Sequence, residues 1–188
     1  MEISNVKKLA NEHGIIVRIG DVLDTILIAL EDGRDTAPEL ILADVNMLLE
    51  CSYQHYLYRY DAMILPYLEE IGKSQIQSKL QFFIDQYYPG TKVLINILDA
   101  MESYNDNKSQ TIDHVIEYGH QYLDRFQPVF LKEGKEVVDL LNEDLSKEEI
   151  STLEDKIDDF EDSWNGPSLM NYRTMVRELE LKAVITQW

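Results

Sequence analysis

Apolar residues recur along much of the chain at alternating steps of three and four, which places them on one face of a long α-helix. The first such stripe predicts a helix that begins at Ser4, whose side chain can cap it, and ends near Leu30. Its inward positions are Val6, Leu9, His13, Ile16, Gly20, Leu23, Leu27 and Leu30. A histidine therefore lies on an inward stripe that is otherwise apolar.

Three further stripes predict long helices over residues 38–71, 74–104 and 111–142. Polar residues interrupt the second stripe, which runs through Leu40, Ala43, Met47, Glu50, Gln54, Leu57, Asp61, Ile64 and Leu68. We expect a kink at Pro66, a break at residues 88–90 and a kink near Pro128. Short loops make successive long helices antiparallel, so the prediction is an all-α, up-down-up-down four-helix bundle.

Two shorter helices are predicted after the fourth long one. Ser146 and Glu149 form a capping box for an amphipathic helix that ends near residue 162. A break at residues 165–168 precedes a last helix over 169–185. We therefore expect a bundle domain over residues 1–162 and a C-terminal helical extension over residues 163–188 that packs on it.

Composition agrees with a folded helical domain. The 188 residues suit one domain, and a hydrophobic content of 45% is ample for a buried core. The single cysteine, Cys51, cannot form an intrachain disulfide. The first thirty residues lack a signal-peptide pattern, and no stretch has the length and apolarity of a membrane span. We therefore expect a soluble, cytoplasmic protein.

The chain is strongly acidic. It has 35 acidic and 17 basic residues, for a net charge of −18. This excludes nucleic acid as a default partner and disfavours anionic membranes, because both require a basic surface. Ten of the acids lie within residues 142–162, which predicts a solvated face there. No phosphate-binding glycine loop, nucleophile elbow or Cys-x-x-Cys motif supports nucleotide or hydrolytic chemistry. The partners compatible with the sequence are another protein or a second copy of the chain.

Four segments carry a recognisable pattern of landmarks. They are Leu9-Ala-Asn-Glu-His13, the segment from Tyr56 to Gly72 with its Leu65-Pro66-Tyr67, the segment Gln86-Tyr-Tyr-Pro-Gly-Thr91, and the segment from Glu133 to Leu141 followed by Leu145-Ser146-Lys147-Glu148-Glu149. Over residues 4–162 this pattern resembles the hemerythrin-like, or HHE cation-binding, family. The resemblance implies a four-helix bundle of the kind that holds a di-iron centre through inward histidines and carboxylates.

The resemblance also shows which iron ligands this chain keeps. The ligand positions of the family fall on His13, on Leu57 and Asp61, on Tyr87, and on Val129 and Glu133. Most of the imidazoles are therefore replaced by apolar or phenolic side chains. The metal ligands that the resemblance still implies are His13, Asp61 and Glu133.

Two functions are compatible with these residues. The first is a degenerate hemerythrin-like domain without a di-iron centre or other cofactor, which acts as a structural, regulatory or interaction module. His13 would then hydrogen-bond to Asp61, to Glu133 or to a tyrosine. The alternative is a protein that binds iron or another divalent metal, either one ion held by His13, Asp61 and Glu133 or two irons with shifted ligands. The histidines available for such a shift are His55, His114 and His120.

Overall fold

The computed structural model describes the backbone of residues 6–185 and, within this range, all side chains except those of residues 6–12, 133–135, 138, 169 and 185. Ser4, the predicted cap of the first helix, lies outside this range. Helices dominate and no strand occurs among the described residues, which confirms the all-α prediction. The elements are α1 (Val6–Glu31), α2 (Pro38–Leu48), η1 (Leu49–Leu57), η2 (Tyr60–Ile64), α3 (Leu65–Glu70), α4 (Ser74–Glu102), α5 (Lys108–Arg125), α6 (Gln127–Asp144), α7 (Lys147–Ser163) and α8 (Leu169–Ile185).

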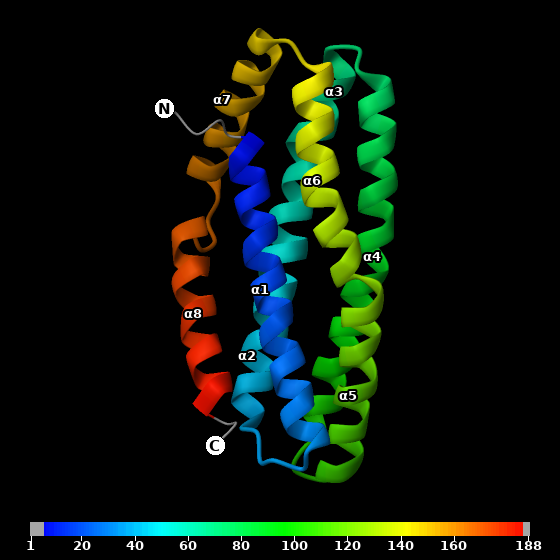
Figure 1. Ribbon diagram of the computed structural model, residues 1–188, viewed down its shortest axis with the longest axis vertical. Coiled ribbons are helices and arrows are strands. Elements are labelled where there is room, and N and C mark those ends of the chain that lie inside the picture. Colours follow the sequence, from blue (N-terminus) through cyan, green and yellow to red (C-terminus); the bar gives the residue numbers. More distant parts are fainter. Residues whose placement is uncertain (1–5, 186–188) are drawn as a thin grey trace.

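The long helices run side by side along the long axis of the molecule (Figure 1). α1 packs against α2, α5 and α6, and α4 packs against α2, α3, α5 and α6. The side chains between these helices form one apolar core. Leu23 and Ile26 of α1 and Leu80 and Leu94 of α4 are fully buried in it. Removal of this apolar surface from water is the main force that holds the helices together.

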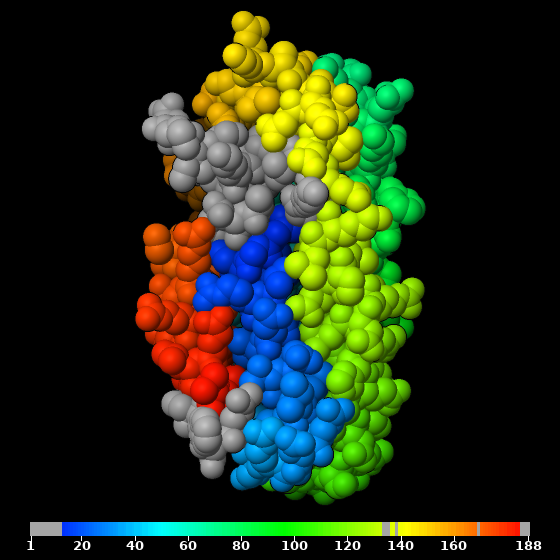
Figure 2. All heavy atoms as spheres, viewed as in Figure 1, coloured from blue at the N-terminus to red at the C-terminus, as the bar shows by residue number. Residues whose placement is uncertain are grey.

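The two C-terminal helices pack on the outside of the longer ones. α7 begins with the predicted capping box, in which the Ser146 hydroxyl accepts from the Glu149 backbone N–H and the Glu149 carboxylate accepts from the Ser146 backbone N–H. α8 packs against α1 and α2, and its atoms follow the flank of α1 (Figure 2). Arg18 of α1 donates two hydrogen bonds of 2.8 Å to Glu180 of α8. No helix within the described range has the length and apolarity to cross a bilayer.

The second long helix is continuous from Pro38 to Glu70, but its middle is wound as π-helix over η1 and η2. Hydrogen bonds from residue i to i+5 put more residues into each turn than the 3.6 of an α-helix. The buried positions therefore follow steps of four through Ser52, Tyr56, Tyr60, Ile64 and Leu68. Gln54 and Asp61, which the predicted stripe places inward, are exposed. The inward placement expected of Asp61 is thus corrected, because Tyr60 occupies that position.

The prolines affect the helices differently from the prediction. α4 continues through Pro89 and Gly90 without the expected break. Pro66 lies inside the continuous second long helix, directly after its π-helical segment, so its missing N–H removes one helical hydrogen bond without ending the helix. Pro128 lies in the first turn of α6, where a missing N–H costs no helical hydrogen bond. The predicted fourth helix is divided into α5 and α6 at Phe126, just before Pro128.

Candidate functional site

His13 is buried, as its place on the inward stripe of α1 predicts, and it contacts tyrosines of the second long helix. Its side chain is 5% exposed. The Nε2 atom lies 2.6 Å from the Tyr56 hydroxyl oxygen, and the two rings meet edge to face at 4.8 Å. The Tyr56 hydroxyl donates a hydrogen bond of 2.9 Å to the hydroxyl of Tyr60. The imidazole therefore belongs to a buried chain of aromatic hydrogen-bonding groups.

The structure does not bring Asp61 to His13. Asp61 is exposed, and its carboxylate accepts a hydrogen bond from the Tyr88 hydroxyl. This hydrogen bond, together with burial, raises the pKa of Tyr88 to about 12. The side chain of Glu133 lies outside the described residues. Among the side chains that are described, no group of three or more His, Cys, Asp or Glu could hold a metal ion.

Aromatic and aliphatic side chains occupy the other positions at which the resemblance to the hemerythrin-like family would place iron ligands. Leu57 is 1% exposed and Tyr87 is fully buried. The ring of Tyr87 stacks on Phe130 with a centroid distance of 4.1 Å. Val129 packs against the same core. These contacts give the layer around His13 the character of a packed core.

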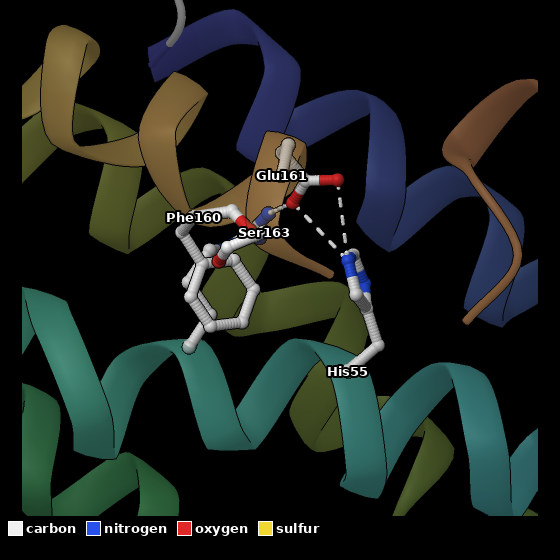
Figure 3. Close-up of polar contacts among 5 residues, drawn as sticks. His55, Phe160, Glu161 and Ser163 are labelled. Atoms are coloured by element: carbon white, nitrogen blue, oxygen red, sulfur yellow. Dashed lines mark hydrogen bonds and ion pairs between the residues drawn. The ribbon is translucent and has the colours of Figure 1, made fainter. Parts of the chain in front are cut away.

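A buried ion pair, which the sequence reasoning missed, attaches α7 to the second long helix. Arg59 is fully buried and donates a 2.8 Å hydrogen bond to Glu161 of α7. His55 is also buried and lies 3.1 Å from the same carboxylate (Figure 3). Burial alone would raise the pKa of Glu161, but the contacts with His55 and Arg59 outweigh it and lower the pKa. The spacing of four between His55 and Arg59 is the one sequence signal of this pair.

The remaining histidines lie away from His13. His120 Nε2 is 2.7 Å from the Glu31 carboxylate in a partly exposed pair between α5 and α1. His114 stands near the ring of Tyr118 on the same helix. His55, His114 and His120, the histidines available for a shifted metal centre, therefore lie in three separate environments.

A second group of buried polar side chains lies between α2, η1 and α5. Asp44 is fully buried, and neither of its carboxylate oxygens has a hydrogen-bond partner among the described residues. Burial raises the pKa of Asp44 well above its ordinary value of 3.8. Burial also raises the pKa of Tyr122, and the charge of Asp44 adds to this effect. Contacts with the hydroxyls of Ser52 and Tyr53 act in the opposite direction on the pKa of Tyr122.

A groove of about 480 Å³ runs along the surface between α4 and α6. Its lining includes Phe82, which is 64% exposed, and Phe83. The other side chains that line it are Ser78, Lys79, Glu136, Asp139, Leu140 and Glu143. The lining of the groove therefore combines apolar side chains with charged ones that are mainly acidic.

We compared the chain with models of known protein families, with curated proteins and with solved structures, and none of the three comparisons found a match. Functional inference therefore rests on the residues and their geometry.

Proposed function

We propose that this chain is a hemerythrin-like four-helix bundle that has lost its di-iron centre and acts as a structural, regulatory or interaction module. One observation carries the proposal: aromatic packing fills the layer in which the iron ligands of that family meet. His13 contacts Tyr56, and Tyr87 stacks on Phe130. Such a layer stabilises the fold through burial of large rings.

The donor set does not fit two irons. A di-iron centre takes several imidazoles and bridging carboxylates that project into the bundle core. Among the described side chains, His13 is the one imidazole in ring contact with Tyr56, and the Tyr56 phenol lies within hydrogen-bond distance of its Nε2 atom, whereas His55 contacts rings of α7 and α8 and Trp164. Asp61 is at the surface and hydrogen-bonds Tyr88 instead.

The packing order of the helices supports the proposed bundle. α1 contacts the second long helix on one side and α5 and α6 on the other, and α4 contacts the same two neighbours. This closed order is that of four helices around a single core, with successive helices adjacent and antiparallel. We place the bundle at residues 1–162 and the extension, with α8 against α1 and α2, at residues 163–188.

An interaction module needs a surface to which a partner can bind, and the groove between α4 and α6 is the proposed one. Exposed Phe82 offers an apolar anchor, and Glu136, Asp139 and Glu143 offer negative charge beside it. Charge complementarity favours a partner segment that carries both apolar and basic side chains.

Metal analysis tests the proposal directly. The purified chain is loaded aerobically with ferrous iron, freed of excess metal, and examined by elemental analysis and by visible absorption. We expect no retained iron, no charge-transfer band, and a melting temperature that chelators do not change. Two irons per chain with a visible band would overturn the proposal. A single retained ion that His13→Ala abolishes would overturn it too, in favour of the metal-binding alternative.

A further inference from the structure

The last helix, α8, has apolar side chains on its outward face as well as on the face that packs against the bundle. Tyr172 and Val176 are fully buried against the longer helices. On the opposite side, Met170, Leu181 and Val184 are 66%, 59% and 50% exposed. A helix at the surface of a globular protein normally has polar and charged side chains on its outward face. Packing within one chain therefore does not explain the outward residues of α8.

Two arginines lie on the same outward face. Positions 170, 173, 177, 181 and 184 recur at steps of three and four, so they follow one line along the helix. The residues at these positions, named here the α8 stripe, are Met170, Arg173, Arg177, Leu181 and Val184. Both arginines are exposed. The α8 stripe thus presents two positive charges between apolar side chains, in a chain whose net charge is −18.

The groove between α4 and α6 carries the opposite charge. Three carboxylates and Lys79 line it. Glu136 lies 3.8 Å from Lys132 of the same helix, so the carboxylates that we assign to a partner are those of Asp139 and Glu143, both of which are exposed. These two residues are four positions apart, which is about 6 Å along a helix axis. The arginines of the α8 stripe have the same spacing, so two helices side by side can pair each arginine with one carboxylate.

The apolar side chains of the two surfaces can meet in the same arrangement. Met170 precedes the first arginine by three residues and Leu181 follows the second by four, so each lies about one helical turn from an arginine. Whichever direction α8 takes along α6, one of these side chains comes within reach of the exposed ring of Phe82 in the groove. Removal of these apolar groups from water favours the contact.

We propose that the groove between α4 and α6 binds α8 of a second copy of this chain, so that copies associate head to tail. The proposal rests on the proposed role of the chain as an interaction module, and it names the partner. α8 cannot fill the groove of its own chain, because it lies against α1 and α2 on one flank of the molecule while α4 lies on the other (Figure 1). Each pair of copies leaves one groove and one α8 stripe open, so further copies can add to form a ring or a filament.

The net charge of the chain opposes contact between copies, and the local charges must outweigh it. At a salt concentration of about 150 mM, exposed charges more than about 8 Å apart are largely screened, whereas arginines and carboxylates that touch are screened less. One helix face in one groove makes a small interface, so we expect a dissociation constant on the order of 10–100 μM.

Sedimentation equilibrium of the full chain in about 150 mM sodium chloride tests the proposal. The weight-average mass of wild type should rise above the 21.9 kDa of one chain as the concentration increases from about 5 to about 300 μM. Phe82→Ser removes the exposed ring of the groove and Arg177→Glu reverses a charge of the α8 stripe. Each should raise the dissociation constant about tenfold or more. Ile95→Ser, an exposed apolar position of α4 outside the groove, and Lys182→Glu, an exposed cation of α8 outside the stripe, should associate like wild type.

An equimolar mixture of Phe82→Ser and Arg177→Glu distinguishes the head-to-tail contact from a symmetrical one. The first variant keeps its α8 stripe and the second keeps its groove, so the mixture contains one intact pair of surfaces. It should form a 1:1 complex with about the affinity of wild type and no larger species. A mixture without such a complex, or a Phe82→Ser variant that associates like wild type, would contradict the assigned surfaces.

A wild-type chain that stays monomeric up to about 300 μM would overturn the second copy as the partner. This result would leave the proposed function standing, because the proposed function is tested by the retention of iron. Retained iron in a chain that associates as expected would have the opposite meaning, so the two failures can be told apart.

Discussion

Glu161→Gln tests whether the buried ion pair holds α7 against the second long helix. Arg59 is fully buried, and its ion pair with Glu161 is 2.8 Å long. His55 contacts the same carboxylate. Glutamine keeps the shape of the side chain and one acceptor oxygen but removes the negative charge. The guanidinium of Arg59 would then remain buried beside a neutral amide.

The expected loss of stability follows from the burial of the two partners. Removal of one partner from a fully buried ion pair costs about 3–5 kcal/mol. Glu161 is 25% exposed, and the amide retains part of the hydrogen bonding, so we expect about 1.5–3 kcal/mol. For a chain of this size this corresponds to a fall in the melting temperature of about 4–10 °C. Asp162→Asn, an exposed neighbour on the same helix, should change stability by less than about 0.5 kcal/mol.

Urea denaturation followed by circular dichroism at pH 7 measures both variants, and hydrogen exchange shows whether α7 opens first. The native pKa of Glu161 is lowered, so the advantage of wild type over Glu161→Gln is present above the ordinary carboxyl pKa of 4.5. It should disappear as the pH falls through the native pKa. If the free energies of unfolding of Glu161→Gln and Asp162→Asn agree within about 0.5 kcal/mol, the role assigned to the ion pair of Arg59 and Glu161 is refuted.

Three further predictions use the same denaturation assay. Gly90→Ala should lower the free energy of unfolding by about 1–3 kcal/mol, because its new Cβ atom would lie 2.2 Å from the Tyr53 hydroxyl. Gly14→Ala, whose new Cβ atom meets open space, should raise the free energy of unfolding by up to about 1 kcal/mol. Ser146→Ala removes the capping box of α7 and should cost about 1 kcal/mol; an unchanged midpoint would contradict this. The stability of wild type relative to Asp44→Asn should fall as the pH rises above 3.8, by at most about 1.4 kcal/mol per pH unit, because the native state alone keeps the proton on Asp44; parallel pH profiles would contradict it.

The helices could be predicted from the sequence because their signals are local. Apolar spacing indicates the long helices, and the Ser146 and Glu149 pair marks the start of α7 within one residue of its observed position. The ion pair of Arg59 could not be predicted, because its partner lies 102 residues later in the chain. The role of Gly90 was equally hidden, since the phenol that needs its space belongs to another helix.

The π-helical winding explains why the spacing of the second long helix wrongly places Asp61 in the core. The predicted stripe uses steps of three and four, so it places Asp61 inward and Ala43, rather than Asp44, inward. The wider turns of η1 and η2 shift the buried face, so that Tyr60 is fully buried while Asp61 is exposed. Ala43 and Asp44 lie before these turns, in α2, and there the predicted stripe is wrong by one residue, because Asp44 is fully buried and Ala43 is exposed. Polar residues already interrupt the predicted stripe of this helix, so the apolar pattern does not reveal that Asp61 is placed on the wrong face.

Asp61→Asn makes this difference measurable. Because Asp61 is exposed, its replacement should change stability by less than about 0.5 kcal/mol. The hydrogen bond to Asp61 contributes to the raised pKa of Tyr88, so the pKa of that phenol should fall from about 12 toward its ordinary value of 10.0 in a difference ultraviolet titration. A large loss of stability with an unchanged tyrosine titration would instead place Asp61 in the core, where the three-and-four spacing predicts it.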